Sequence, residues 1–572
     1  MKKDIKKSLW ILLLAALLPL SACEDFLNSP PVGSLSAEGF YLTPKQSEQG
    51  VVGVYSLLRS LTSTQYWFLS EVRSDNVWAR PIPNGGFRNY SELSNFRALP
   101  SLDIINNGWN QWYRVIYDAN TALSKIPGCN FGTNEAFKDQ LMGELYFLRG
   151  WAYFELVRLY GNIPIVNTPL SPDDAANVPQ SDAKTVYDTR IVPDLLEAKN
   201  LLPLEQDLKN VVGASATAYG RAGQLAATAM LGKVYMTMAG FPVNDASKRA
   251  LAKNELKAII DYSEANGNQF WAPDSIEWRK QWMSEYNNTY SIFAIQHRSG
   301  GTGNTAISEM SMEWPSTYSR WTPGISCEGW LEKSLVFEFT KRYPYTDAGG
   351  TPQTRKDARG FGYTLYSANF PVGIAPGWTA AHAVAPTYED ITIDGETLTI
   401  ETNAYIYKFL NSYPKRAELG FTTDIQSIMT ARGEWPVNYP VIRYEDVLLM
   451  YAEILASEGT NGDGTVNTTT ALGIVNKIRE RAGCTPETDA TKAMEFIKRE
   501  RRIEFAGEGI RWFDIVRWND WRQNILDMFT RYGNPEATSP NNVTVGRHLY
   551  PIPEEQNNVK PGFYIQNEGY SF

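Results

Sequence analysis

The sequence predicts a mainly α-helical protein in which helical hairpins pack against an irregular, loop-rich region with a few short strands. Two observations support this fold class. Apolar residues recur in steps of three and four over several segments, which is the period of an amphipathic helix. Between about residues 267 and 440 this period is lost, and Gly, Pro, Ser and Trp become frequent instead.

Four helices are expected in the first half of the chain and three in the second. Gly161, Pro203 and Gly240 mark the ends of the first three, because neither residue type continues a helix well. The expected bounds are 140–161, 183–202, 221–239, 246–262, 444–457, 469–482 and 491–504. A short strand pair is expected over 391–402.

These helices follow one another in pairs, which is typical of helical-hairpin repeats. Leu231, Gly232 and Tyr235 match the Leu-Gly-x-x-Tyr core of the tetratricopeptide consensus, in which glycine lets two helices approach closely. The spacing between pairs is irregular. We therefore expect tetratricopeptide-like hairpins rather than a regular repeat array.

Charge and composition restrict the partners. The chain has 54 Lys plus Arg against 63 Asp plus Glu, a net charge of −9. Proteins that bind nucleic acid through phosphate contacts need the opposite sign, so nucleic acid is not an expected partner. Aromatic residues make up 13% of the chain, with 17 Trp and 31 Tyr. Because aromatic rings dominate cores and interfaces, this surplus is expected in the core, at a protein contact or at a ligand-binding surface.

The N-terminus carries an export signal. Four lysines precede the apolar run 9–18, which is too short to span a bilayer, because spanning takes about 20 apolar residues. The small residues Ser21 and Ala22 stand directly before Cys23 and resemble the bacterial lipobox. Cleavage there would leave Cys23 as a lipid-modified first residue; the alternative is an ordinary cleavable signal that contains a cysteine.

We accordingly expect four parts in the chain. They are a lipoprotein signal peptide (1–22), a lipidated tether (23–36), an N-terminal helical half (37–265), and a loop-rich and C-terminal half (266–572) that forms one compact unit with the first.

Signals for common chemistry are missing from the sequence. There is no H-E-x-x-H, no Gly-x-x-x-x-Gly-Lys loop and no Cys-x-x-Cys. The histidines at 297, 382 and 548 are far apart in the sequence, so no histidine metal site and no cofactor are expected, while a structural metal ion with other ligands stays open. Cys129, Cys327 and Cys484 are expected to be packing residues rather than disulfide partners.

Several blocks resemble the SusD/RagB family of surface lipoproteins found in glycan-degrading Bacteroidetes. The longest is 496–518, FIKRERRIEFAGEGIRWFDIVRW. Shorter ones are ELYFLRGWAYFELVRLY at 144–160, IRYEDVLLMYAE at 442–453, and YPIP at 550–553 leading to QNEGY at 566–570. The similarity covers nearly the whole mature chain, and Cys23 is where the family has its lipid-modified cysteine.

The resemblance implies a mostly helical fold with an irregular region packed against helical hairpins. It also implies residence on the outer face of the outer membrane, partnership with a TonB-dependent (SusC-like) transporter, and capture of glycan for that transporter without cleavage. The alternation of Arg and Glu over 498–508 could suggest an acid and base set, but we expect a structural ion network, since Arg forks pair readily with carboxylates.

Two loop stretches have the composition of a glycan-binding surface, in which rings stack on sugar C–H patches and planar polar groups bind hydroxyls. Pro and Gly within them favour exposed loops. The expected stacking residues are Trp78, Trp314, Tyr318 and Trp321, and the polar candidates are Asp75, Asn76, Arg80 and Arg320. The alternative is that these rings pin the loops to the body. Trp278, Trp282 and Tyr286 recur every four residues and are expected in the core instead.

Three other functions are compatible with the sequence. A relative with the same fold could capture peptides, which favours deep side-chain pockets over an exposed aromatic surface. A glycoside hydrolase would need two carboxylates flanking the sugar bond, and no pair can be singled out. A helical scaffold without a small ligand would keep every binding property on losing Trp314 or Trp321.

Overall fold

The computed structural model describes residues 40–79, 88–215, 220–283, 289–297, 329–361, 364–366, 386–406, 408–409, 413–422, 437–459, 470–532 and 540–572. The predicted signal peptide, the tether and Cys23 lie outside these residues, as do Cys327 and Tyr286.

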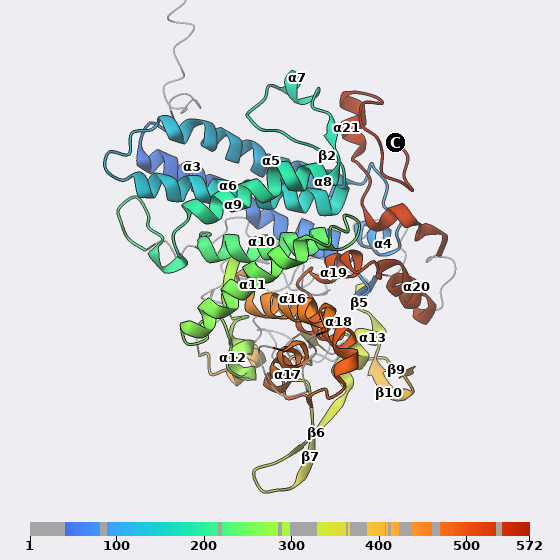
Figure 1. Cartoon of the computed structure of the whole chain (residues 1–572). Helices are drawn as coiled ribbons and strands as arrows, with labels where there is room; N and C mark the ends of the chain where they lie inside the picture. The colour runs from blue at the N-terminus through green and yellow to red at the C-terminus, as the bar shows by residue number, and fades with distance from the viewer. Residues whose placement is uncertain are drawn as a thin grey trace, which may run out of the picture.

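Helices build the N-terminal half and pack against one another from one end of the molecule to its middle (Figure 1). They are α3 (Pro44–Leu61), continued by η1 (Thr62–Glu71), α5 (Asp103–Lys125), α6 (Glu135–Tyr160), α8 (Ala183–Val186), η3 (Tyr187–Ile191), α9 (Val192–Leu201), α10 (Gln224–Ala239) and α11 (Lys248–Ala265). The four helices predicted here are confirmed, since 140–161 is α6, 221–239 is α10 and 246–262 is α11. The range 183–202 is continuous but contains a π turn before Pro193, which lacks the N–H that a regular helix needs there.

Glycines at two helix contacts explain how closely the helices pair. A Cβ placed on Gly232 of α10 would lie 2.7 Å from Leu256 Cδ2 on α11, and one on Gly143 of α6 would lie 2.9 Å from Leu202 Cγ. Both distances are shorter than carbon atoms tolerate. The predicted role of Gly232 in a close helix approach is therefore confirmed.

The C-terminal half packs α16 (Tyr444–Ser457) against α10 and α11 and contains a set of shorter helices. These are α12 (Ser275–Lys280), α13 (Lys333–Thr340), α14 (Tyr413–Glu418), α17 (Ala471–Arg481), α18 (Ala493–Glu504), α19 (Arg511–Arg517), α20 (Trp521–Tyr532) and α21 (Glu554–Val559). The predicted helices 444–457, 469–482 and 491–504 correspond to α16, α17 and α18, the last preceded by the short turn η9 (Ala490–Lys492).

The strands among the described residues form antiparallel two-stranded sheets. The pairs are β1 (Val77–Ala79) with β5 (Gly329–Leu331), β2 (Ile163–Pro164) with β3 (Gln180–Ser181), β4 (Ser291–Ile295) with β12 (Tyr439–Arg443), β6 (Arg342–Thr346) with β7 (Pro352–Lys356), β8 (Leu365–Tyr366) with β11 (Tyr405–Ile406), and β9 (Tyr388–Ile393) with β10 (Glu396–Glu401). The strand pair predicted over 391–402 is confirmed as β9–β10. Asp394 and Gly395 at its turn both have positive φ, as a tight two-residue hairpin requires.

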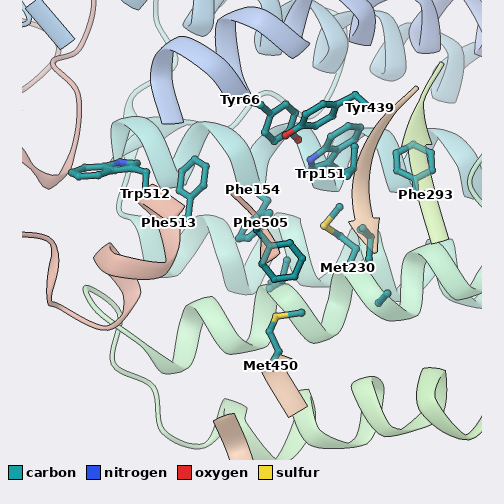
Figure 2. Close-up of a cluster of buried hydrophobic side chains, with 14 of the residues drawn as sticks. Tyr66, Trp151, Phe154, Met230, Phe293, Tyr439, Met450, Phe505, Trp512 and Phe513 are labelled. Atoms are coloured by element: carbon teal, nitrogen blue, oxygen red, sulfur yellow. The ribbon is translucent and has the colours of Figure 1, made fainter. Parts of the chain in front are cut away.

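One continuous hydrophobic core joins the two halves (Figure 2). Trp151 of α6 lies edge-on to Phe293 of β4, with ring centroids 5.6 Å apart, and Tyr66 stacks on Tyr439 of β12 at 4.7 Å. The helical half and the irregular region therefore share buried surface.

Several predicted core residues are confirmed. Trp278 and Trp282 are each only 1% exposed, and Cys129 and Cys484 are buried without a disulfide. Within the part of the chain that the structure describes, no helix is both long and apolar enough to cross a membrane.

Candidate functional site

Two of the predicted ligand-binding stretches join the body at one place. The chain leaves β1 at Ala79 toward residues 80–87 and enters β5 at Gly329 after residues 298–328, and Ala79 and Gly329 are register partners in the β1–β5 pair. Segments that lie far apart in the sequence therefore start from adjacent backbone. We call the β1–β5 and β8–β11 pairs the loop base.

The start of a further segment, residues 367–385, and a second strand pair adjoin this base. Leu331 N donates to Ala404 O at 3.1 Å, which ties β5 to the start of β11, and β8 pairs with β11 before residues 367–385 begin. On the β4–β12 pair, His297 N donates to Asn438 Oδ1 at 2.9 Å. His297 comes directly before residues 298–328, and Asn438 comes shortly after residues 423–436. The bond therefore holds the start of the first segment close to the end of the second.

Trp78 lies in β1 and differs from its prediction. Its side chain is only 7% exposed, and its ring stacks on Tyr532 of α20 with centroids 4.3 Å apart and planes 7° from parallel. The expected exposure of this ring is wrong, because pairing with β5 and packing on α20 cover it. A sugar could stack on Trp78 only if Tyr532 moved away, so the ring pins the loop to the body.

Asp75 is also buried rather than open to a ligand. Its carboxylate accepts hydrogen bonds from Arg511 Nε at 2.7 Å and Nη2 at 2.8 Å. Burial acts to raise the pKa of Asp75, but the guanidiniums of Arg511 and Arg502 outweigh it and hold the pKa well below its usual range. Asp75 is an ionised structural partner, which corrects its predicted position on an exposed loop.

Asn76 is fully buried and has partners on both sides of its amide. Its Nδ2 donates to Glu71 Oε1 at 2.9 Å, and its Oδ1 accepts from Arg502 Nε at 2.9 Å. The predicted exposure of Asn76 is therefore wrong for the same reason, since buried polar groups must be satisfied inside the protein.

The other predicted site residues lie outside the described residues. They are Arg80, Trp314, Tyr318, Arg320 and Trp321. Their ligand contacts stay predictions.

Arg502 and Glu332 hold the loop base, and sequence reasoning did not single them out for this role. Arg502 Nη1 donates to Ser334 Oγ at 2.8 Å and its Nη2 lies 3.2 Å from Glu332 Oε2. Glu332 N donates to Asn76 O at 2.8 Å. One guanidinium thus joins Asn76, directly before β1, to the helix start after β5. The alternation of Arg and Glu over 498–508 was the feature of the sequence that could have indicated this role.

That alternation forms the predicted structural ion network. Glu504 accepts from Arg359 Nη1 at 2.8 Å, Arg443 Nη1 at 2.9 Å and Arg481 Nη2 at 3.1 Å. Burial opposes its charge, yet the surrounding guanidiniums, led by Arg481, hold the pKa of Glu504 well below its usual range. The predicted ion network is confirmed by this burial and pairing.

The network extends to Glu508. Its carboxylate accepts from Arg443 Nε at 2.8 Å and from Lys408 Nζ at 2.7 Å, and all three side chains are buried. Arg residues that each bind two or more acceptors fix several segments at once.

A cleft of about 430 Å³ lies beside the loop base, between α13, the β9–β10 turn, α18 and α20. Asp75, Arg502 and Ser334 form one wall, and charged residues of both signs form the others. Lys498 is paired there with Asp520. Among the described residues, no group of three or more His, Cys, Asp or Glu side chains is arranged to hold a metal ion.

The fold and this base define a class of protein: a mainly α-helical scaffold in which connecting segments far apart in the sequence start from or end at adjacent strands. Two family models match the chain, one described as "SusD family" over residues 393–570 and one as "Starch-binding associating with outer membrane" over residues 73–236. The chain belongs to the SusD/RagB family, as its sequence blocks indicated.

Relatives with similar sequences cover most of the chain. It is 26% identical over 537 residues to SusD-like protein P38 of Formosa agariphila, covering 91% of this chain and 92% of the relative. It is 24% identical to a SusD-like protein of Bacteroides ovatus, covering 91% of this chain and 83% of the relative.

Solved structures share the fold. A SusD homolog from Bacteroides thetaiotaomicron superposes with a TM-score of 0.66 at 21% identity, covering 93% of this chain and 98% of the other. A laminarin-binding SusD-like protein gives 0.61 at 23% identity, with coverages of 92% and 99%. Surface glycan-binding protein A from Bacteroides fluxus gives 0.64 at 21% identity, also with 92% and 99%.

Proposed function

We propose that this protein is a cell-surface lipoprotein, anchored to the outer membrane through Cys23, that captures oligo- or polysaccharide and delivers it to a TonB-dependent transporter. It acts by binding and cleaves no bond. Capture of peptides by the same fold is the alternative that the experiments below separate.

The pairing of β1 with β5 is the observation that carries the proposal. It roots the two stretches that are rich in aromatic and planar polar residues on adjacent backbone, at Ala79 and Gly329. Loops held by a rigid body are common sites of recognition. Rings from one loop and amide or guanidinium groups from the other can then contact one sugar chain.

The relatives support the same function. Two proteins of the same fold are named for binding laminarin and surface glycan, and the family description includes starch binding and association with the outer membrane. The apolar run before Cys23 supports export and lipid attachment.

Within the loops, Trp314, Tyr318 and Trp321 are the proposed stacking residues, and Arg80 and Arg320 the proposed hydroxyl-binding groups. Trp78, Asp75 and Asn76 contribute indirectly by holding the loop base.

Binding without cleavage is supported by the state of the carboxylates at the base. A glycosidase needs a carboxylic acid that keeps a proton until it reaches the leaving oxygen. Asp75 is held ionised by Arg511, so it does not suit a general acid. Glu332 is engaged by Arg502 and Arg531 at 3.2 and 2.6 Å, within the ion-paired loop base.

Calorimetry against plant, host and microbial oligosaccharides, with oligopeptides in parallel, tests the proposal. We expect a glycan to bind and expect Trp321→Ala and Trp314→Ala each to weaken binding by about 1–3 kcal/mol, taking the size of aromatic stacking on nucleic-acid bases as the guide. Tyr388→Ala is the matched control, because this ring is 63% exposed on β9 and outside the proposed loops. Binding of peptides alone, or release of new reducing ends from a glycan, would overturn the proposal.

Anchoring and delivery have their own test. Cys23→Ser should abolish incorporation of a fatty-acyl label and release the protein from the membrane fraction. Copurification of the wild-type protein with a TonB-dependent transporter is the result expected for delivery, and its absence under mild detergent would remove that part of the proposal.

A further inference from the structure

The β6–β7 hairpin projects from the body at the end opposite the long N-terminal helices (Figure 1). Every residue of 344–356 except Asp347 is exposed, on both faces of the hairpin. Only Tyr343 at its root is buried, in a small cluster with Ala482 and Cys484. The hairpin is thus an arm with a fixed root and with solvent on both sides.

Local hydrogen bonds keep the arm in one shape. Asp347 Oδ1 accepts from Gly349 N at 2.9 Å and from Thr351 N at 2.8 Å, which closes the turn. At the root, Arg355 Nε donates to Gly483 O at 2.6 Å. The side chains of the arm are therefore presented at defined positions.

Two cations face each other across the arm. Arg342 is the direct register partner of Lys356, and like charges at such positions destabilise a strand pair. Burial, followed by the charge of Arg342, lowers the pKa of Lys356, while Glu401 acts in the opposite direction from beyond ion-pair distance. The arrangement costs stability without a visible benefit to the fold.

The cations of the arm lack nearby carboxylates. Among the described residues, no carboxylate oxygen lies within 4.0 Å of a nitrogen of Arg342, Arg355 or Lys356, although ion pairs are frequent elsewhere in the chain. Asp347, the acidic residue of the hairpin, is engaged in the turn. The arm is thus a local positive surface on a chain of net charge −9.

An aromatic ring accompanies these charges. The Arg355 guanidinium lies 5.0 Å from the centroid of the Tyr345 ring, which is 37% exposed. Gln353 and Thr354 beside it offer hydroxyl and amide groups. A protein partner would need an apolar interface centre, which this arm lacks, whereas a sugar ring with an acidic group would use the ring, the amide and the cations together.

We propose that the β6–β7 hairpin is a second contact site that binds anionic glycan through carboxylate or sulfate groups on its sugars. The inference rests on the proposed function and narrows its ligand to glycans that carry negative charge. Arg342, Arg355 and Lys356 bind the anionic groups, and Tyr345 contacts the sugar ring.

The test compares three probes with the full mature protein: oligogalacturonate for carboxylate, sulfated dextran oligosaccharide for sulfate, and neutral laminarin oligosaccharide. We expect one or both anionic probes to bind at low salt and to weaken as salt rises. The double variant Arg342→Gln/Lys356→Gln should lower that affinity at least tenfold and leave any neutral binding unchanged.

Lys253→Gln/Lys257→Gln on α11 is the matched control, because it removes the same charge from a partly exposed and an exposed lysine that pair with Glu458 and Asp261 on another part of the surface. The hairpin variant should melt no lower than wild type, because it removes a like-charge pair, and this outcome separates lost binding from lost fold.

Equal anionic binding by the hairpin variant and wild type would overturn the inference. So would binding of polyglutamate but neither anionic glycan, which would make the arm a protein contact. Binding of neutral glycans only would overturn this inference and leave the proposed function standing, whereas failure of every glycan in the calorimetric panel would overturn both.

Discussion

Arginine serves opposite purposes in the buried ion network and in the β6–β7 hairpin. Around Glu504, the guanidiniums of Arg359 and Arg443 are fully buried and each reaches more than one carboxylate. On the hairpin, Arg342 faces Lys356. The difference teaches that the pairing of charges, rather than their number, separates residues that hold this fold from residues that it presents to solvent.

The cost of burial explains the difference. A charge removed from water costs several kcal/mol unless opposite charges and hydrogen bonds replace the solvent. In the network each charge therefore has partners. Two exposed cations repel only weakly, because water screens them, so the hairpin tolerates an arrangement that the core would not.

The strongest test of this comparison is to neutralise the centre of the network. Glu504→Gln leaves the guanidiniums of Arg359, Arg443 and Arg481 without a shared counter-charge, and we expect the free energy of unfolding to fall by about 3–5 kcal/mol. Chemical denaturation followed by tryptophan fluorescence measures it.

The matched control is Glu458→Gln, whose carboxylate pairs with Lys253 and is 44% exposed. We expect a loss below about 1 kcal/mol. Similar losses in both variants would mean that the network does not stabilise the fold more than a surface pair does.

Substitution of Trp78 tests whether this buried ring at the loop base stabilises the fold rather than binding a ligand. Trp78→Ala removes the ring that stacks on Tyr532, and we expect the free energy of unfolding to fall by about 3 kcal/mol. Trp78→Phe should recover most of that loss. Trp321→Ala, in contrast, should lower glycan affinity without a change in melting temperature, and a stability-neutral Trp78→Ala that abolishes binding would reverse the assignment.

Lowering the pH should remove the stability contributed by the buried carboxylate–guanidinium pairs before it affects the hairpin. The pKa values of Asp75 and Asp446 are held below the ordinary aspartate value of 3.8, so the unfolded chain takes up these protons first as pH falls. Stability from these pairs is therefore full above about pH 5 and is lost progressively below pH 4.

Melting temperatures measured from pH 7 to pH 2.5 check this, and we expect them to fall below about pH 4. Asp390→Asn, at an exposed residue of β9, should keep the same profile. A melting temperature that stays constant down to pH 3 would contradict the expected contribution of the buried pairs.

The smallest expected effect is a gain in stability rather than a loss. Arg342→Gln removes the repulsion across the hairpin from Lys356, and we expect the free energy of unfolding to rise by about 0.2–1 kcal/mol. Denaturation at low and high salt measures it, and the gain should shrink as salt screens the charges. A destabilised variant would show that Arg342 holds the arm in place.

Much of the fold could be predicted from the sequence because helical periodicity is local. The bounds predicted for α16 agree with Tyr444–Ser457. Two long helices, α3 and α5, were not predicted, although Thr43 and Gln46 form a capping box at the start of α3 and buried residues recur at helical spacing along α5. Those signals are present in the sequence.

The site was less predictable, because its contacts join distant segments. Proline and glycine after residue 79 indicated a loop, but the strand that covers Trp78 lies at Gly329–Leu331. Likewise, the Arg and Glu block indicated an ion network but not its members, since Arg443 and Arg359 are 61 and 145 residues from Glu504 along the chain.

The loop base has a consequence for how such proteins diversify. Residues 80–87 run between Ala79 of β1 and Arg88, and residues 298–328 run between His297 and Gly329 of β5, so each segment has both ends on described structure. An insertion in either segment costs only the entropy of closing a longer one, about 0.6 kcal/mol for each doubling of length. New cargo preferences can then arise by insertion, deletion or transplantation of whole segments while the helices fold as before. The same property makes this scaffold suitable for engineering receptors with exchanged recognition segments.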